Sequence, residues 1–148
     1  MGKLDLTSFG EQLFLNCVAY LADPAQVTFQ GLTITGGRSV TISRGGGILN
    51  KGAQLTLKGV TVEGNAATEA GGGVYNAGVL RISRSIIRDN DASVGAGIAN
   101  TLSLFIEDSE FTGNGSPDSE GGAVQTALAS FLTVKRSTFS DNEGNRGG

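Results

Sequence analysis

Five segments of the chain share one alternation of apolar and polar residues. They begin at Val27, Leu55, Leu80, Leu104 and Leu132. Their first and third residues are apolar, with Thr, Arg or Phe between them, and this period of two is typical of a β-strand with one buried face. The eighth residue is again apolar: Ile34, Val62, Ile87, Phe111 and Phe139. Each segment therefore predicts two short strands separated by a corner, near Gly31, Gly59, Arg84, Asp108 and Arg136.

A glycine motif between the segments predicts a third strand. It reads GGGILN at 45–50, GGGVYN at 71–76, GAGIAN at 95–100 and GGAVQT at 121–126. The segments begin 24 to 28 residues apart, so length varies in the loops while the strand pattern is kept. Strands this short must pair with those of the next repeat. The pattern therefore predicts an all-β solenoid, a right-handed parallel β-helix of about five coils over residues 27–148.

Asparagines recur at two positions of the repeat. One set follows the second strand and the other closes the glycine motif: Asn65, Asn90, Asn114 and Asn142, and Asn50, Asn76 and Asn100. An amide has two donor hydrogens and an acceptor oxygen, so stacked copies can bond to one another or to the backbone of a corner. We interpret both sets as structural ladders. Gly37 and Thr126 interrupt them, so the ladders are expected to weaken there.

Residues 1–26 predict an N-terminal capping helix and a lead-in. Ser8 and Glu11 fit a capping box, apolar residues that include Cys17 recur at helical spacing, and Asp23 and Pro24 end the run. We expect this amphipathic helix to cover the first coil, because the end of a solenoid exposes core and unpaired strand edge.

The other end shows no cap. Gly147 and Gly148 stand where a further glycine motif is due, so the solenoid is expected to be truncated at its C-terminus. Since an uncapped coil presents open strand edges, end-to-end self-association through it is a hypothesis.

Charge and composition weigh against several classes of partner. The net charge is −3, from 11 basic and 14 acidic residues, and tryptophan and histidine are absent. We therefore expect no nucleic acid as a partner. No apolar run approaches the ~20 residues that span a bilayer, so no membrane insertion is expected. We expect no signal peptide in this chain, because no basic stretch followed by an uninterrupted apolar run is visible near Met1. With a single cysteine and no Cys/His cluster, the sequence predicts no metal site and no cofactor.

Four short motifs carry a family resemblance. GGGI at 45–48, GGAV at 121–124, FTGN at 111–114 and FSDN at 139–142 resemble the paired repeats of the polymorphic outer membrane proteins, which are bacterial surface adhesins of the pectin-lyase-like superfamily. The resemblance implies an adhesin-like or surface-display segment of a larger exported bacterial protein, located outside the cell or at its surface. The expected partner is then a carbohydrate or a host or cell-surface protein.

A polysaccharide lyase or hydrolase is the alternative function. Candidate acids are present: Glu63, Asp89, Glu107, Asp108, Glu110 and Asp141. Stacking gives three of them basic neighbours: Glu63 beside Arg88, Asp108 between Arg84 and Arg136, and Glu107 beside Lys135. Such pairs lower the pKa of a carboxyl group, whereas a glycosidase needs an acid whose pKa is raised. We therefore favour a non-catalytic protein and assign no catalytic residue.

Two binding hypotheses stay open. A column of charge formed by Arg84, Arg88, Asp108 and Arg136 is the candidate site for an acidic sugar. The loop at 115–120 could ligate calcium, although its two carboxylates fall short of the six to eight oxygens that calcium usually takes.

A threonine column is also visible but broken. Thr28, Thr56 and Thr133 share one position of the repeat, and Arg81 and Phe105 interrupt it. A flat threonine array of the ice-binding kind is therefore not expected.

Overall fold

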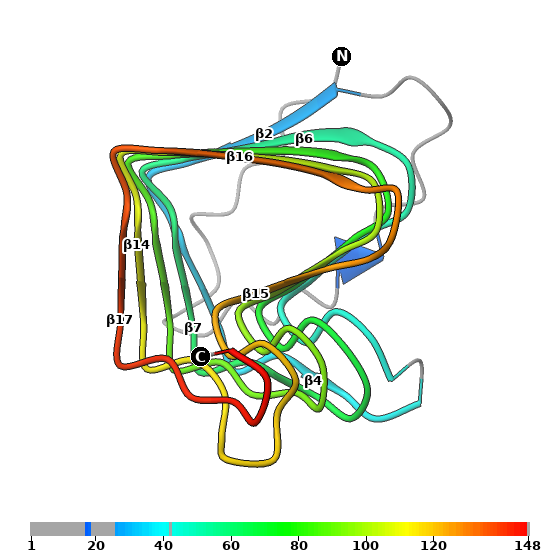
Figure 1. Cartoon of the computed structure of the whole chain (residues 1–148). Helices are drawn as coiled ribbons and strands as arrows, with labels where there is room; N and C mark the ends of the chain where they lie inside the picture. Colours follow the sequence, from blue (N-terminus) through cyan, green and yellow to red (C-terminus); the bar gives the residue numbers. More distant parts are fainter. Residues whose placement is uncertain (1–16, 19–25, 42, 148) are drawn as a thin grey trace.

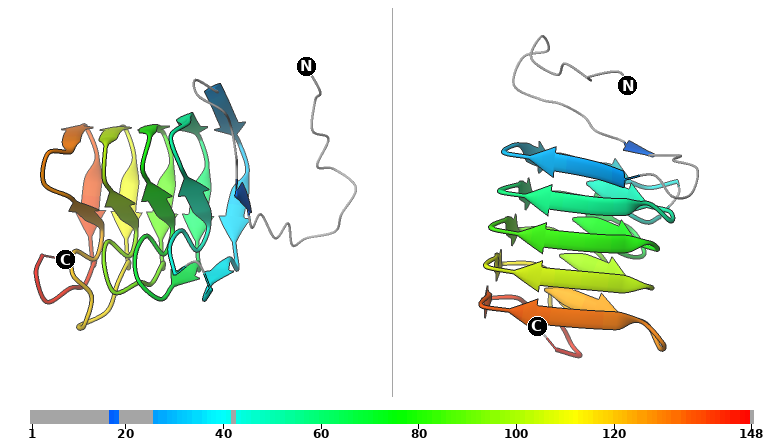
Figure 2. Two further views of the ribbon diagram at one scale, coloured as in Figure 1. Left: turned by 90° about the vertical axis from the view of Figure 1, so that its right-hand side faces the viewer. Right: turned by 90° about the horizontal axis from the view of Figure 1, so that it is seen from above.

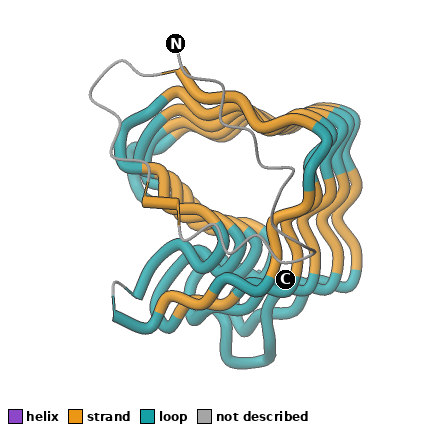
Figure 3. Tube along the Cα trace, turned by 180° about the vertical axis from the view of Figure 1, so that it is seen from behind, coloured by secondary structure: helices purple, strands orange, loops and turns teal. Residues whose placement is uncertain are grey.

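The chain forms a stack of coils with parallel sheets along its sides. The computed structural model describes residues 17–18, 26–41 and 43–147. Viewed down the stack, successive coils lie over one another around a common interior (Figure 1). Viewed from the side, the coils form a row of evenly stacked strands (Figure 2). The longest connections project from one side of the stack, between the sheets called C and A below (Figure 3).

Three five-stranded sheets each take one strand from every coil. Sheet A contains β1 (Cys17–Val18), β5 (Ile48–Asn50), β9 (Val74–Asn76), β12 (Ile98–Asn100) and β15 (Val124–Thr126). Sheet B contains β2 (Gln26–Gln30), β6 (Gln54–Lys58), β10 (Val79–Ser83), β13 (Ser103–Glu107) and β16 (Phe131–Lys135). Sheet C contains β3 (Thr33–Thr35), β7 (Thr61–Glu63), β11 (Ile86–Arg88), β14 (Glu110–Thr112) and β17 (Thr138–Ser140). A small sheet of β4 (Arg38–Ser39) and β8 (Ala66–Ala67) lies among the loops.

The strand register joins equivalent positions of the repeat. Leu80 lies between Leu55 and Leu104 in sheet B, and every strand pair is parallel. The chain enters sheet B five times and so completes four turns between β2 and β16. The predicted solenoid is confirmed, with its strands paired from coil to coil.

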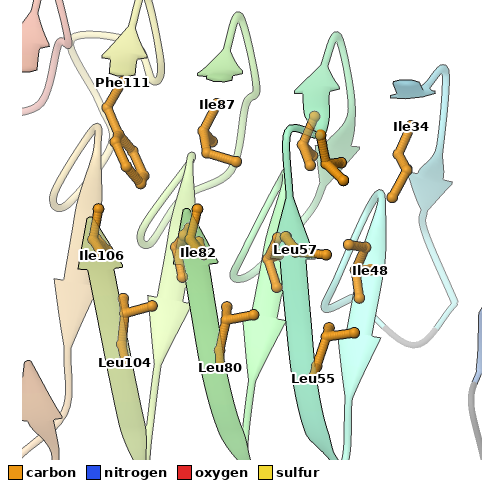
Figure 4. Packing of buried hydrophobic residues seen from close by; sticks show 14 of the residues in the cluster. Ile34, Ile48, Leu55, Leu57, Leu80, Ile82, Ile87, Leu104, Ile106 and Phe111 are labelled. Atoms are coloured by element: carbon orange, nitrogen blue, oxygen red, sulfur yellow. The ribbon is translucent and has the colours of Figure 1, made fainter. Parts of the chain in front are cut away.

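Apolar columns fill the interior (Figure 4). The buried cluster includes members from all three sheets: Ile48, Val74 and Ile98 from A, Leu55, Leu57, Leu80, Ile82, Leu104 and Ile106 from B, and Ile34, Val62, Ile87 and Phe111 from C. In β10, Leu80 and Ile82 are 0% and 2% exposed while Arg81 between them is exposed. A slip of one residue would bury Arg81, so the core fixes the register of the outer face as well.

The corner between sheets B and C uses left-handed backbone. Arg84, Asp108 and Arg136 have φ of 48°, 48° and 45°, in the column where earlier coils have Gly31 and Gly59. A side chain in this conformation costs roughly 1 to 2 kcal/mol. The corner predicted from the sequence is thus a column of positive φ.

The glycine motif is needed where coils approach closely. A Cβ on Gly72 would overlap the backbone carbonyl oxygen of Asp91 in the following coil. A side chain at this position would force successive coils apart.

The N-terminal prediction needs a correction at Cys17 and Val18. These residues form β1, which pairs in parallel with β5, placing Cys17 opposite Ile48 and Val18 opposite Leu49. A helix at Cys17 is therefore wrong, because the open edge of sheet A takes these residues as a strand. The rest of the predicted capping helix and lead-in lies outside the described residues.

The last coil leaves apolar side chains exposed. Phe131, Leu132 and Val134 of β16 are 69%, 44% and 42% exposed. Phe139, 41% exposed, stacks on Phe111 with ring centroids 4.7 Å apart and planes inclined by 13°. The inward column of sheet C, aliphatic in the first three coils, thus ends in a stacked aromatic pair, called the aromatic column below.

Candidate functional site

The first asparagine ladder follows sheet C. Nδ2 of Asn65, Asn90 and Asn114 donates to Oδ1 of the asparagine in the following coil, at 3.1, 2.9 and 2.8 Å, and the last acceptor is Asn142. The same Oδ1 atoms accept the backbone N–H of the preceding asparagine. The N–H of Gly37 donates to Asn65 at 2.9 Å, so the ladder begins on backbone in the first coil. The predicted ladder is confirmed.

The second ladder follows sheet A. Asn50 donates to Asn76 at 2.7 Å and Asn76 donates to Asn100 at 2.8 Å. Asn100 then donates to the carbonyl oxygen of Phe131 at 3.3 Å, where Thr126 occupies the next position. Throughout the described part of the chain, every buried side-chain nitrogen or oxygen has a hydrogen-bond partner. The ladders therefore supply hydrogen-bond partners for the amide groups that are buried inside the coils.

The corner between sheets B and C concentrates charge. Arg136 donates to both carboxylate oxygens of Asp108, at 2.7 and 3.2 Å, and also donates to Glu107. The predicted neighbours Asp108 and Arg136 are thus paired. Glu107 lies opposite Lys135 in the register, as expected, but its carboxylate binds Arg136. The guanidinium has several donors and reaches both acids from the corner, which strand register alone does not reveal.

A second ion pair lies on the outer face of sheet C. Arg88 donates to Glu63 at 2.7 Å, as the stacking of their strands predicts. Of the four residues assigned to an acidic-sugar site, the structure brings Arg84, Asp108 and Arg136 into one corner column, while Arg88 lies apart on β11. Three of the four residues are therefore engaged in ion pairs, and only Arg84 lacks one among the described residues.

The ion pairs shift the pKa values of Asp108, Arg88 and Arg136. The hydrogen bond from Arg136 is the largest cause that holds the pKa of Asp108 below its ordinary value; burial opposes it, and the charges of Arg136 and Arg84 add to the lowering. The hydrogen bond and charge of Glu63 raise the pKa of Arg88, and Asp108 and Glu107 raise that of Arg136. The lowered pKa keeps the Asp108 carboxylate ionised, which makes it a poor proton donor.

A groove of about 350 Å³ crosses the loops of four coils. Its charged lining residues are Arg38, Asp91 and Asp118, and serine, threonine, alanine and valine side chains form the rest of the lining. Ser119 is buried there and donates to the carbonyl oxygen of Ala92 at 2.8 Å, which ties the longest loop to the preceding coil. The loop proposed for calcium thus forms part of this groove. Among residues 17–18, 26–41 and 43–147, no three Cys, Asp or Glu residues cluster as a metal site would require.

A hollow of about 310 Å³ lies on the outer side of sheet A. Arg44 donates to Glu69 at 3.2 Å and to the hydroxyl of Tyr75 at 3.3 Å, and its guanidinium lies 5.2 Å from the centre of the Tyr75 ring. A carboxylate, a guanidinium and a phenol thus lie together in one hollow. No sequence pattern indicated this group, because Arg44 comes from a loop of variable length.

Arg81 and Phe105, which interrupt the threonine column, form a cation–π contact on sheet B. The guanidinium of Arg81 lies 4.5 Å from the centre of the Phe105 ring, on the outer face of β10 and β13. Their adjacent positions in the repeat could have revealed this contact, since residues in register on neighbouring parallel strands lie side by side.

The stacked coils, ladders and outward charges define a repeat protein of the parallel β-solenoid class. The family of right-handed β-helix regions matches residues 16–147, and the chain belongs to it. This family covers both structural and carbohydrate-active proteins. No curated protein and no solved structure matches the chain. In the described segments no helix is long and apolar enough to cross a membrane.

Proposed function

We propose that the chain is a non-catalytic β-helical segment of the adhesin or surface-display kind, belonging to a larger exported bacterial protein. Its coils would hold an outer face rigidly for binding a carbohydrate or a host or cell-surface protein. The parent protein would act outside the cell or at its surface. The narrower resemblance to the polymorphic outer membrane proteins supports this proposal and stays a prediction.

The observation that carries the proposal is the pairing of acids with arginines across coils. Glu63 binds Arg88, and Glu107 and Asp108 bind Arg136. A general acid in a glycosidase must hold its proton near neutral pH, whereas Arg136 lowers the pKa of Asp108, and the carboxylates of Glu63 and Glu107 are each occupied by a guanidinium. The pairs instead join neighbouring coils at their outer surface, as expected of a scaffold that displays a rigid face.

The test is an activity assay on the purified chain. Polygalacturonate, alginate and xylan are incubated with it, and new reducing ends and unsaturated products are followed over time. We expect no release above that of a heat-denatured sample. Product formation proportional to protein concentration would overturn the proposal.

A carbohydrate-active protein is the second candidate, and the contacts of Arg44 with Glu69 and Tyr75 favour it. Since Glu69 is itself paired with Arg44, it would serve there as a base or nucleophile, with the Tyr75 hydroxyl as the proton donor. If the assay detects cleavage, its loss in Glu69→Gln and its retention in Glu107→Gln would assign it to this hollow. Equal loss in both variants would contradict that assignment.

End-to-end association stays a prediction. The exposed Phe131, Leu132 and Val134 of the last coil give an apolar surface beside an unpaired strand edge. Light scattering over a concentration series should show a rising mass, and a constant monomer mass would contradict the prediction.

A further inference from the structure

The outer face of sheet B contains two adjoining hollows. One, of about 310 Å³, is lined by Arg81, Phe105, Thr133 and Lys135 among others. The other, of about 250 Å³, is lined by amide and hydroxyl side chains together with Arg81. Arg81 borders both hollows, so a ligand that occupies either one meets its guanidinium.

Arg81 differs from most arginines of the chain. Ion pairs to carboxylates occupy four of the others: Arg44, Arg88, Arg136 and Arg146. Within the described residues, Arg81 has no carboxylate partner and contacts the Phe105 ring instead. A ring contact holds the cation in place but takes none of its five N–H donors. The stacked guanidinium is therefore positioned to bind an oxyanion.

The surrounding charges favour an anion on this face. Lys135 lines the same hollow as Arg81, and Lys58 projects from the neighbouring strand β6. Glu107 also lines the hollow and shares Arg136 with Asp108, so its charge is only partly offset, but Arg81, Lys58 and Lys135 outnumber it on this face. The face is thus locally basic in a chain whose net charge is −3.

The spacing of these cations indicates the size of the ligand. Arg81 on β10 and Lys135 on β16 are two strands apart, which is about 10 Å across a sheet. An oligomer with an acidic group on successive units spans this distance and can contact both. Gln26, Gln54 and Thr56 line the second hollow and offer hydrogen bonds to a hydroxyl-rich chain.

We propose that the outer face of sheet B binds an anionic oligosaccharide, with Arg81 as the central residue that contacts its acidic groups and Lys135 as a second cation. This inference rests on the proposed function and specifies the ligand and the face that binds it. It moves the site from the ion-paired residues Arg88 and Arg136 to a cation without a carboxylate partner. The few cations, and the acidic charge of the whole chain, favour such a glycan over a nucleic acid.

The test measures binding by isothermal titration calorimetry at low salt. The probes are a hexamer of galacturonic acid, a sulfated hexasaccharide, neutral xylohexaose and a single-stranded DNA of six nucleotides. We expect one or both anionic glycans to bind, xylohexaose to bind far more weakly, and the affinity to fall with salt. The two anionic probes distinguish carboxylate from sulfate recognition. No binding of either anionic glycan, equal binding of xylohexaose, or tighter binding of the DNA would overturn the inference.

Matched variants locate the site. Arg81→Gln should weaken binding about tenfold or more, and Arg81→Lys should weaken it less, because it keeps the charge but loses the planar group of donors. Arg38→Gln is the control, since Arg38 is an exposed arginine of the loop groove. Binding unchanged within twofold in Arg81→Gln, or an equal loss in Arg38→Gln, would overturn the assignment. Thermal unfolding of each variant separates a loss of contact from a loss of fold.

This test and the activity assay can fail separately. Cleavage of a probe during the titration would overturn the non-catalytic function while leaving the binding face in place. Stable probes that do not bind would overturn the binding face while leaving the non-catalytic function in place.

Discussion

Replacing Asn90 with alanine removes the centre of the first ladder. The Asn90 side chain is buried and makes four hydrogen bonds. Its Oδ1 accepts the backbone N–H and the Nδ2 of Asn65, both at 3.1 Å. Its Nδ2 donates to the carbonyl oxygen of Val62 at 3.0 Å and to Oδ1 of Asn114 at 2.9 Å. The substitution therefore leaves polar groups of both neighbouring coils without their hydrogen-bond partners.

The size of the effect follows from those four bonds. A typical intramolecular hydrogen bond contributes about 0.5 to 1.5 kcal/mol net, and a buried polar group left without a partner costs about 1 to 3 kcal/mol. We therefore expect Asn90→Ala to lower the free energy of unfolding by about 4 kcal/mol. This is a large share of the ~5 to 15 kcal/mol by which most domains are stable.

Two further substitutions make the prediction specific. Asn100 ends the second ladder and makes two such bonds, from Asn76 at 2.8 Å and to Phe131 at 3.3 Å, so Asn100→Ala should cost about half as much. Asn145 is exposed and its side chain makes no such bond, so Asn145→Ala is the control and should stay within about 0.5 kcal/mol of the parent chain.

The assay is urea unfolding followed by circular dichroism, with midpoint and slope compared for the parent and the three variants. The order expected for the loss of stability is Asn90, then Asn100, then Asn145. If Asn90→Ala unfolds at the same midpoint as the control variant, the ladder does not stabilise the coils and the reasoning is refuted. An unchanged slope shows that the coils still unfold together.

Three further predictions concern the corner, the aromatic column and the glycine motif. Arg136→Gln should raise the pKa of Asp108 toward its ordinary value, as an NMR titration of the carboxyl group would show. Because the folded pKa is lowered, the stabilising contribution of the pair is present above the ordinary pKa of Asp108 and is lost as the pH falls through the folded pKa. Phe139→Ala removes a partly exposed ring stacked on Phe111 and should cost about 1 to 3 kcal/mol in urea unfolding. Gly72→Ala places a methyl group against a backbone carbonyl of the next coil and should cost about 3 kcal/mol or more, or prevent folding.

Each of these predictions has a control. Arg81→Gln removes a cation from the same sheet without contacting Asp108, so the pKa of Asp108 should not move. Phe131→Ala removes a ring that is 69% exposed and should cost less than Phe139→Ala. Gly31→Ala meets no atom within 4 Å and is strained only by its φ of 62°, so it should cost about 1 to 2 kcal/mol. If a control variant shows the same change in pKa or in stability as its test variant, the role argued for the corresponding contact is contradicted.

The interior could be predicted from the sequence because stacking repeats one rule at every coil. Once Leu55, Leu80 and Leu104 are placed in one column, the register of the whole sheet follows. The same rule predicts the asparagine ladders and the neighbours Glu63 and Arg88. Period-two burial and parallel pairing leave no freedom for these positions.

The outer surface could be predicted less well, because side-chain reach and loop length vary from coil to coil. Arg136 extends from a corner to bind Glu107, although the register places Lys135 opposite that acid. Arg44 comes from a loop and meets Tyr75 across the outer side of sheet A. The strand at Cys17 was missed because two residues are too few to show an alternation.

The difference between interior and surface indicates where this fold can acquire a function. Leu80 and Ile82 fix β10 in the core, and the position between them points outward whatever residue occupies it. That column contains Thr56, Arg81 and Phe105 in successive coils without a change of register. A substitution at Arg81 should therefore alter binding with little effect on stability, whereas one at the ladder should alter stability on every face. Measuring both quantities for Arg81→Gln and Asn90→Ala tests this separation, and a large loss of stability in Arg81→Gln would contradict it.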